Sequence, residues 1–205
     1  MGQLKRFDPQ ERLDCAVDAF WEHGFDGSGM QALCKAMGLF PGSLYGTYGD
    51  KRQLFLAAVE RYMATVSTEM VELLNADASG LTALRRYFDR LIDGIVDGKR
   101  RWGCLITNTI VELAQREPTI AAKIDINMAR LETAFAGAIA RARQAGEIPS
   151  DTPLDSASLL VCVVQGMNVL AKTKPSRQQL ELIVSTALTA LGAPANSTKP
   201  MESRS

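Results

Sequence analysis

Histidine and clustered cysteine are scarce in this sequence, and their scarcity argues against metal chemistry and most catalytic chemistry. His23 is the single histidine among 205 residues, and its place at the end of the first predicted helix suits a cap or a surface residue. The four cysteines lie far apart and form no CxxC pair: Cys15, Cys34, Cys104 and Cys162. A zinc site needs a tight cluster of ligands, and a catalytic site needs a nucleophile with a base or a metal. We therefore expect no metal, no cofactor and no enzymatic activity.

Long apolar runs are absent as well. We find no run of the roughly 18–20 apolar residues that a membrane span needs, and residues 1–12 lack the apolar core of a signal peptide. Both absences predict a cytoplasmic protein without a membrane partner. The even number of cysteines could indicate disulfide pairs, but without an export signal we expect reduced thiols.

Net charge is also absent, because 23 Lys and Arg residues balance 23 Asp and Glu residues. Residues 1–62 contain seven basic and eight acidic side chains, so composition alone does not indicate a nucleic-acid-binding protein. The distribution is more favourable, since residues 27–52 contain three basic residues against one acid, Asp50. A local basic edge is what phosphate contacts require. The assignment of a function therefore depends on motifs.

Helical periodicity is present along most of the chain. Apolar residues recur at i, i+3, i+4 and i+7 in several segments: 13–20, 55–62, 81–95, 124–135 and 180–191. Capping-box patterns begin at three positions: Asp8, Asp50 and Ser176. Thr152-Pro153 predicts a further helix start. We find no convincing strand alternation and expect an all-α fold.

The segment 24–51 predicts two short helices at about 28–36 and 41–47, separated by residues 37–40. Gly38 stands where the first helix must end in a left-handed residue, which glycine adopts at little cost. Apolar residues fix the crossing of the two helices: Leu33, Met37, Leu39, Leu44 and Tyr48. This arrangement is a helix-turn-helix, whose second helix enters the major groove of DNA.

The same segment resembles the signature of the TetR family of transcriptional regulators, G-[FY]-x-x-[ST], then G-[LV]-x-x-G-x-L-Y-x-x-[FY]-x-x-K-x-x-L. The matching residues are Gly24, Phe25, Ser28, Leu33, Gly38, Leu39, Gly42, Leu44, Tyr45, Tyr48, Lys51 and Leu54. The resemblance covers about the first third of the chain. Phe40-Pro41 and Gly46-Thr47 depart from the usual residues, and Cys34 stands where Ala is common. These departures leave the operator sequence open.

The resemblance implies a set of DNA contacts. Tyr45 and Lys51 would contact phosphates, and Ser28 would cap the first motif helix and face the DNA backbone, although Gly29 could be the cap instead. Residues at or near base edges would be Gln31, Phe40, Pro41, Gly42, Ser43 and Thr47. Small residues let the helix N-terminus approach DNA, and Gln can recognise adenine. The alternatives are a core position for Tyr45 and an uninvolved solvated face for Ser43 and Thr47.

The chain divides into three parts on this interpretation. Residues 1–50 would form an N-terminal three-helix DNA-binding domain, residues 51–194 a C-terminal effector-binding and dimerisation domain, and residues 195–205 a disordered tail. A helix starting at Lys51 would connect the two domains mechanically. The small residues 75–80 interrupt the helical pattern, and longer helices follow them.

The stretch 101–112 resembles the GCLxxNTxxE segment of one TetR subgroup, which includes regulators that sense electrophiles or oxidants. The resemblance implies that Cys104 could be a sensing thiol. A cysteine after Gly103, at the start of a helix and near Arg100 and Arg101, should have a stabilised thiolate. The alternative is that Cys104 is a small core residue.

Other side chains could line a pocket for a small apolar or aromatic effector. The candidates beside Cys104 are Phe88, Leu91, Trp102, Asn108, Met128, Leu131, Phe135, Cys162 and Gln165, with Ile95, Leu105, Thr109 and Asn168 as further members. Such a stripe at helical spacing can equally be plain core. Asn108 and Gln165 are of particular interest, because buried amides need partners that a ligand could supply.

The last two apolar segments, 154–173 and 176–191, resemble the helices that form the dimer interface of TetR relatives. Suitable contact residues are Leu159, Val163, Gly166, Leu170, Ile183, Ala187 and Leu188. The alternative is that these helices close the monomer core. The family resemblance implies a homodimeric repressor that binds double-stranded operator DNA and is released by a small-molecule or electrophile effector. The competing hypothesis is an all-helical adaptor or enzyme that does not bind DNA.

Overall fold

The periodic segments fold as helices in the computed structural model, which describes residues 8–193 apart from the side chains of Lys99 and Arg100. Within this range there is no strand, and the all-α prediction is confirmed. The expected disordered tail, 195–205, lies outside the described residues. The α-helices are α1 (Pro9–Gly27), α2 (Met30–Met37), α3 (Pro41–Tyr48), α4 (Lys51–Tyr62), α5 (Thr68–Asn75), α6 (Gly80–Asp97), α7 (Leu105–Leu113), α8 (Pro118–Gln144), α9 (Ser156–Leu170) and α10 (Arg177–Ala190).

The predicted helix caps are present at α4 and α10. The Asp50 carboxylate accepts from the N–H of Gln53 at 2.8 Å, and the Ser176 hydroxyl accepts from the N–H of Gln179 at 3.2 Å. Asp8 caps α1 through the N–H of the second helical residue at 2.9 Å, whereas a capping box uses the third. Local sequence therefore determines where these helices begin.

The predicted helix start at Thr152-Pro153 is wrong. The Thr152 hydroxyl donates to the carbonyl of Leu191 at 3.0 Å, and α9 begins only at Ser156. The long-range hydrogen bond uses the side chain that would otherwise cap the helix.

The first core combines α1 to α4 with α7 and the beginning of α8. Phe20 and Phe55 meet edge to face at the centre of this core, with ring centroids 4.9 Å apart. Its buried members include Leu33, Met37, Leu44, Leu54, Val59, Leu105, Ile106 and Ile124. Helix α4 therefore packs with the N-terminal helices, although it follows residue 50. The division at residue 50 remains a prediction.

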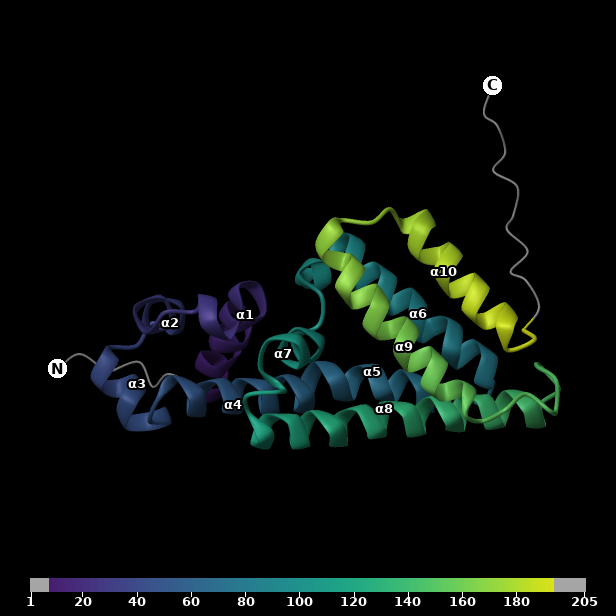
Figure 1. The fold of residues 1–205 in the computed structure, drawn as a ribbon, viewed down its shortest axis with the longest axis horizontal. Coiled ribbons are helices and arrows are strands. Elements are labelled where there is room, and N and C mark those ends of the chain that lie inside the picture. The colour runs from purple at the N-terminus through teal and green to yellow at the C-terminus, as the bar shows by residue number, and fades with distance from the viewer. Residues whose placement is uncertain (1–7, 194–205) are drawn as a thin grey trace, which may run out of the picture.

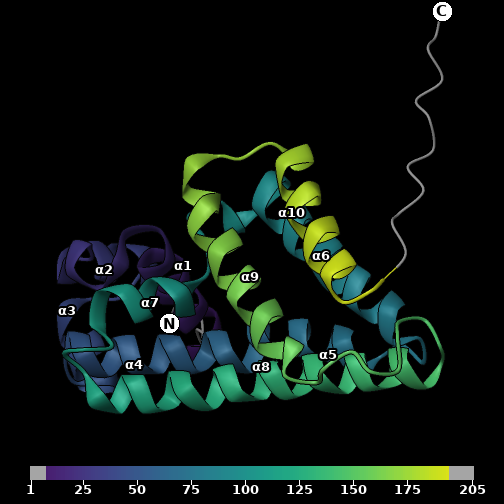
Figure 2. The same cartoon turned by 45° about the vertical axis from the view of Figure 1, so that its right-hand side comes forward.

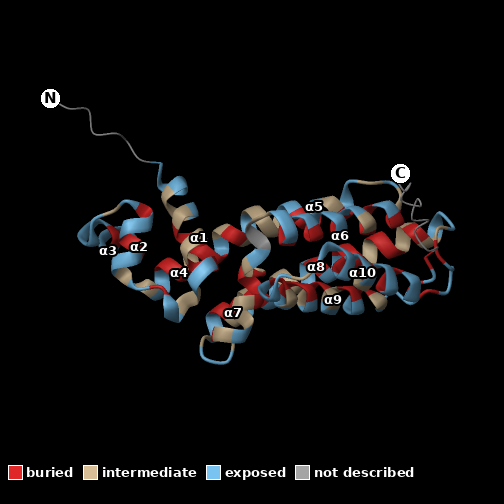
Figure 3. Cartoon of the chain, turned by 90° about the horizontal axis from the view of Figure 1, so that it is seen from above, coloured by how far each residue is buried: buried red, intermediate tan, exposed pale blue. Residues whose placement is uncertain are grey.

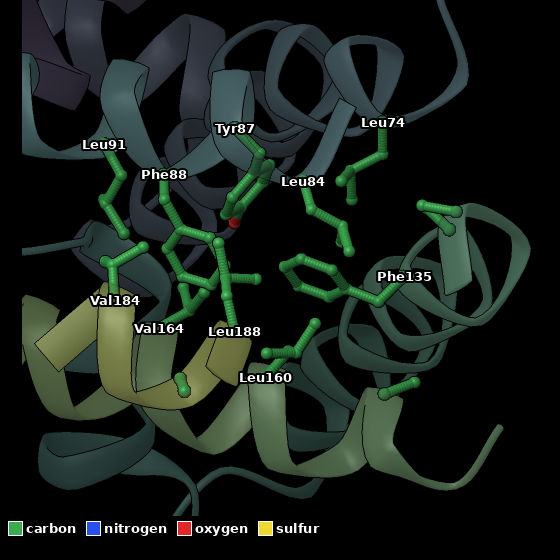
Figure 4. Close-up of a cluster of buried hydrophobic side chains, with 14 of the residues drawn as sticks. Leu74, Leu84, Tyr87, Phe88, Leu91, Phe135, Leu160, Val164, Val184 and Leu188 are labelled. Atoms are coloured by element: carbon green, nitrogen blue, oxygen red, sulfur yellow. The ribbon is translucent and has the colours of Figure 1, made fainter. Parts of the chain in front are cut away.

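The second core lies between α5, α6, α8, α9 and α10. Figure 4 shows Tyr87, Phe88 and Phe135 together at its centre, with Leu160 and Leu188 around them. The rings of Tyr87 and Phe135 are 4.9 Å apart and those of Phe88 and Phe135 are 6.0 Å apart. These aromatic side chains fill the space between the helices, so the C-terminal half has a core of its own.

A π-helical turn, η1 (Met63–Ser67), joins α4 directly to α5. The Thr68 hydroxyl donates to the Met63 carbonyl at 3.0 Å across this turn. Figures 1 and 2 show α4 and α5 running beside α8 from the N-terminal helices into the C-terminal half. Helix α4 begins at Lys51 as predicted, and its role as the connection between two domains stays a prediction. π-Turns within helices are frequent at functional positions.

Helices α9 and α10 keep an apolar outer surface. Leu159, Val169 and Leu182 are 47%, 53% and 67% exposed. Two of the expected interface residues are instead buried in the monomer core: Ala187 and Leu188. The others are exposed or half-buried: Leu159, Val163, Gly166, Leu170 and Ile183.

The stretch Ser156–Thr173 corrects one expectation, because by length and composition alone this helix could cross a membrane. One third of it is buried, and α9 packs against α7, α8 and α10. A single helix of this kind is weak evidence for a membrane span, since the core helix of a globular protein passes the same test. The exposed part of the stretch is the outer surface described above.

Candidate nucleic-acid interface and effector cavity

Helices α2 and α3 form the predicted helix-turn-helix. Gly38 ends α2 in the left-handed region, with φ 61° and ψ 37°. Its N–H donates to the carbonyl of Lys35 at 3.2 Å, and the N–H of Leu39 donates to that of Cys34 at 2.9 Å. The helices begin and end within two residues of their predicted limits. The turn therefore has the geometry that the sequence predicted.

Arg12 stabilises this turn from α1, a contact that the sequence did not reveal. Its guanidinium donates to the Met37 carbonyl at 2.6 Å, and a Cβ on Gly38 would lie 2.6 Å from the same Nη1 atom. Arg12 and Met37 are 25 residues apart, so no periodic signal connects them. The contact fixes α1 against the turn between α2 and α3.

Most residues expected at the DNA are exposed on α2 and α3: Gln31, Phe40, Pro41, Gly42, Ser43, Tyr45 and Thr47. Figure 3 shows α3 at one end of the molecule. Phe40 is 83% exposed and Tyr45 is 50% exposed, which excludes the core position considered for Tyr45. Lys51 is half-buried, and its ammonium lies 4.5 Å from the centre of the Phe25 ring. The end of the molecule thus presents apolar, hydroxyl and amide groups together.

Ser28 does not belong to this exposed set. Its side chain is 2% exposed, and its hydroxyl donates to the Gly24 carbonyl at 2.6 Å. Gly29 is the N-cap of α2, so the expected capping role of Ser28 is wrong and the alternative of Gly29 is correct. Ser28 instead closes the kink at the end of α1.

The C-terminal half contains a cavity of about 40 Å³ between the α4–η1–α5 helix, α8 and α9. Five of the residues considered as effector contacts line it: Cys104, Met128, Leu131, Gln165 and Asn168. Its other lining residues are Tyr62, Ser67, Met70, Val71, Tyr87, Asn127 and Val164. Most of these were not singled out from the sequence, because their apolar periodicity is the same as that of core residues.

The remaining expected effector residues lie elsewhere. Phe88, Leu91 and Phe135 are fully buried in the second core and do not line the cavity (Figure 4). Trp102 and Asn108 line a separate cleft of about 780 Å³ beside α1 and α7. Cys162 is exposed on α9. These six residues do not line the cavity, because the packing of the helices directs their side chains into the second core, into the separate cleft or toward the surface.

Cys104 is the N-cap residue of α7 and is half-buried. Its sulfur accepts a hydrogen bond from the Tyr62 hydroxyl at 3.4 Å, and Tyr62 is the last residue of α4. The guanidinium of Arg101, expected near the thiol, lies over the Trp102 ring at 4.8 Å, and the side chain of Arg100 is outside the described residues. All four cysteines are free thiols. Cys104 is therefore linked through Tyr62 to the first core, which contains the helix-turn-helix.

All three amides considered as ligand contacts have a protein partner, but the oxygen of one of them is buried without a partner. Gln165 accepts from the Thr107 hydroxyl at 2.6 Å and donates to the Met128 sulfur at 3.5 Å. Asn108 donates to the Trp102 carbonyl at 3.0 Å. In Asn168 the amide nitrogen donates to the Val164 carbonyl at 2.9 Å, whereas the buried Oδ1 atom has no partner.

Helix α7 lies beside α1 (Figures 1 and 2), and hydrogen bonds join α7 to α1 at both of its ends. At its start, the Trp21 indole N–H donates to the Gly103 carbonyl at 3.0 Å. Near its end, the Glu112 carboxylate accepts from the N–H groups of Phe25 and Asp26 at 2.9 and 2.7 Å. The cavity and the helix-turn-helix are thus connected through one short helix.

Gly24 makes the second of these junctions possible. It has φ 74° and ψ 179°, which kinks α1 and turns the following N–H groups toward α7. A Cβ at this position would lie 2.8 Å from the Glu112 carboxylate. Glycine therefore provides both the backbone conformation and the space for the carboxylate.

Two family models match the chain. "Bacterial regulatory proteins, tetR family" covers residues 13–58, and "Tetracyclin repressor-like, C-terminal domain" covers residues 80–187. The HTH-type transcriptional regulator YezE of Bacillus subtilis (strain 168) is 34% identical over 148 residues, which are 72% of this chain and 76% of YezE. The repressor ComR of Escherichia coli (strain K12) is 28% identical, with 91% of this chain and 90% of ComR covered.

Solved structures share the fold. A cysteine mutant of the TetR family regulator CifR, complexed with 26-bp double-strand operator DNA, has a TM-score of 0.80 and 24% identity, covering 92% of this chain and 99% of that chain. The reduced form of E. coli NemR has a TM-score of 0.77 and 22% identity, covering 92% of this chain and all of that chain. Together with the family models that span both halves, these matches show that the chain belongs to the TetR family and is a DNA-binding transcriptional regulator rather than an enzyme.

Proposed function

We propose that this protein is a homodimeric cytoplasmic repressor, and that occupation of the cavity beside Cys104 or modification of its thiol releases it from operator DNA. The observation that supports this most directly is the hydrogen bond from Tyr62 to Cys104, because it joins the end of α4 to a cavity-lining thiol. Repression is supported by relatives such as ComR, which are named repressors. A change at the cavity would alter the free energy of DNA binding through α4, which is allosteric coupling.

The operator contacts follow from the exposed side chains of α2 and α3. The Tyr45 hydroxyl and the Lys51 ammonium would bind phosphates. Gln31, Phe40 and Thr47 would lie near base edges, and the small residues before Leu44 would let the start of α3 approach DNA. In a twofold dimer the two α3 helices would enter successive major grooves about 34–36 Å apart, which implies a palindromic operator.

Dimerisation would use the outer surface of α9 and α10. Leu159, Val169 and Leu182 leave an apolar surface that a second copy could cover, and Gly166 would allow the helices to approach closely. A Leu159→Glu variant should shift the protein toward monomer in sedimentation velocity and weaken operator binding. A stable dimer in that variant would contradict this assignment of the interface.

The DNA assignment is tested by selecting bound genomic fragments and then measuring operator affinity for variants. Tyr45→Ala should raise the Kd by about ten- to a hundredfold or more, because a hydrogen bond to a charged group contributes about 1.5–3 kcal/mol. Lys51→Ala should weaken binding and reduce the slope of log K against log salt by about two, which is about one for each subunit of the dimer. Lys172→Ala, an exposed lysine on the effector half, is the matched control and should bind as wild type. Unchanged affinity in both Tyr45→Ala and Lys51→Ala would refute the interface.

The thiol hypothesis is tested with diamide or N-ethylmaleimide in the same operator-binding assay. Wild type and Cys15→Ser should lose the operator after treatment, whereas Cys104→Ser should keep it. Cys15 is a suitable control because it is also half-buried but does not line the cavity. Equal release of Cys104→Ser would show that regulation does not depend on this thiol.

A further inference from the structure

We propose that the cavity beside Cys104 selects a small, uncharged ligand that donates a hydrogen bond to the Oδ1 atom of Asn168. This inference rests on the proposed effector function of the cavity and specifies the chemistry of its ligand. It depends on three properties of the cavity: an acceptor without a partner, walls without charge, and a small adaptable volume.

Asn168 supplies the acceptor. Its side chain is 1% exposed, and its Nδ2 group donates to the Val164 carbonyl at 2.9 Å. Because a carbonyl only accepts, this bond determines which end of the amide is nitrogen and leaves oxygen at the other position. That Oδ1 atom has no protein partner, although Asn168 lines the cavity. A buried acceptor without a donor is unfavourable, so a ligand with an O–H or N–H group would gain affinity there.

The walls determine the charge of the ligand. None of the twelve lining side chains is Asp, Glu, Lys, Arg or His. An ionised ligand would lose its hydration without meeting an opposite charge, which disfavours carboxylates and ammonium groups. The wall has two other amides. Gln165 is already bonded to Thr107 and Met128, and Asn127 is only half-buried, so the Oδ1 atom of Asn168 is the one amide oxygen of the wall that is both buried and without a partner.

The volume determines the size of the ligand. About 40 Å³ has room for roughly three water-sized groups, which suits the polar end of a small molecule. Met70 and Met128 form part of the wall, and unbranched methionine side chains adapt to a ligand more readily than branched ones. Ser67 in the π-helical turn forms another part, so the ligand would lie against the connection between α4 and α5.

Cys104 allows the preference to be measured, because it lines the same cavity and can be alkylated. Three α,β-unsaturated carbonyl compounds of nearly equal shape serve as probes: acrylamide, which has an N–H donor; methyl vinyl ketone, which has none; and acrylate, which is charged. In each reaction the sulfur bonds to the terminal alkene carbon, the π bond of the alkene breaks, and the thiol proton is transferred to the carbon next to the carbonyl. Peptide mass spectrometry then gives the rate at each cysteine of the dimer.

Rates at Cys104 are divided by those at Cys15 in the same molecule, and by those of free N-acetylcysteine, which removes differences in intrinsic reactivity. Acrylamide should be favoured over methyl vinyl ketone at Cys104 by about two- to tenfold, the effect of one neutral hydrogen bond. Acrylate should be disfavoured by more than this. In Asn168→Leu the preference for acrylamide should disappear, whereas Gln178→Leu, which changes an exposed amide on α10 outside the cavity, should retain it.

Equal normalised rates for acrylamide and methyl vinyl ketone at wild-type Cys104 would overturn the proposal, and so would a preference for acrylate. These wild-type rates decide the question even where Asn168→Leu fails to fold. The readout is independent of operator binding. If Cys104 prefers acrylamide but the protein binds no operator, the proposed function is wrong and the ligand preference stands. If the protein binds its operator but Cys104 shows no preference for acrylamide, only the ligand preference is refuted.

Discussion

Replacing Glu112 with alanine removes the carboxylate that joins the end of α7 to the last turn of α1. In the wild type this carboxylate accepts the N–H groups of Phe25 and Asp26 at 2.9 and 2.7 Å. Those residues lead directly into α2, so we expect the variant to be less stable and to hold its helix-turn-helix less firmly. Arg116 provides a control, because it lies in the turn after α7 and forms an ion pair with Asp26 of α1 at 3.0 Å.

The magnitude follows from the surroundings of each bond. A hydrogen bond to a charged group contributes about 1.5–3 kcal/mol when it is shielded from water. The N–H of Phe25 is part-buried and retains most of this value, whereas the N–H of Asp26 is exposed and water replaces its partner. Glu112→Ala should therefore lose about 2–3 kcal/mol of unfolding free energy, equivalent to about 4–12 °C in a chain of this size. The side chains of Arg116 and Asp26 are 57% and 62% exposed, so Arg116→Ala should lose at most about 1 kcal/mol.

Thermal and urea unfolding followed by circular dichroism, at one fixed dimer concentration, measure the difference. Fluorescence anisotropy with the selected operator measures whether the destabilised junction also weakens DNA binding. We expect a larger Kd for Glu112→Ala and an unchanged one for Arg116→Ala. The reasoning is refuted if the two variants lose equal stability, or if Glu112→Ala unfolds with the wild-type midpoint.

Three further predictions concern the helix-turn-helix, an acidic residue and the second core. Gly38→Ala should lose about 1–2 kcal/mol through the left-handed backbone, and more through the clash of its Cβ with Arg12, so operator affinity and unfolding midpoint should fall together. Partial desolvation of the surface residue Asp89, reinforced by the carboxylates of Asp93 and Glu181, raises the pKa of Asp89 above 3.8. Folding stability is therefore lost as the pH rises from 3.8 through that raised pKa. Asp89→Asn should therefore increase stability in urea unfolding at pH 7, with the gain vanishing below pH 3.8; a gain that persists there would contradict this cause. Gly80→Ala would place a methyl group against the Ala138 carbonyl of α8, and thermal unfolding should show a loss of about 3 kcal/mol or more of unfolding free energy. An unfolding midpoint equal to that of the wild type would show instead that α6 can move away from α8 to accommodate the methyl group.

Much of the candidate DNA surface could be predicted from the sequence, because its geometry depends on neighbouring residues. Gly38 ends α2 because glycine adopts positive φ at little cost, and Asp50 caps α4 through an N–H three residues later. The apolar positions of α2 and α3 then leave Gln31 and Tyr45 on the outside. Ser28 was misplaced because its hydroxyl turns back to a kink that the local pattern does not indicate.

The cavity could be predicted only in part. Phe88 and Phe135 have the same helical spacing as Met128 and Leu131, and nothing in that spacing distinguishes a residue that fills the core from one that lines a space. Asn168 could not be separated from Gln165 either, because both are amides on one helix. Only the positions of Thr107 and Met128 give Gln165 its partners and leave the Asn168 oxygen without one.

The sequence by itself determined the helices, the helix-turn-helix and the membership of the TetR family, since each depends on spacing within a few turns of the chain. The tertiary structure alone decided the polar contacts between helices that are far apart in the chain. The Glu112 carboxylate meets α1 across 87 residues of sequence, the Tyr62 hydroxyl meets the Cys104 sulfur across 42, and Arg12 reaches the helix-turn-helix across 25. Such contacts depend on how whole helices pack, because a polar group finds its partner only after the apolar faces have fixed the helices in place.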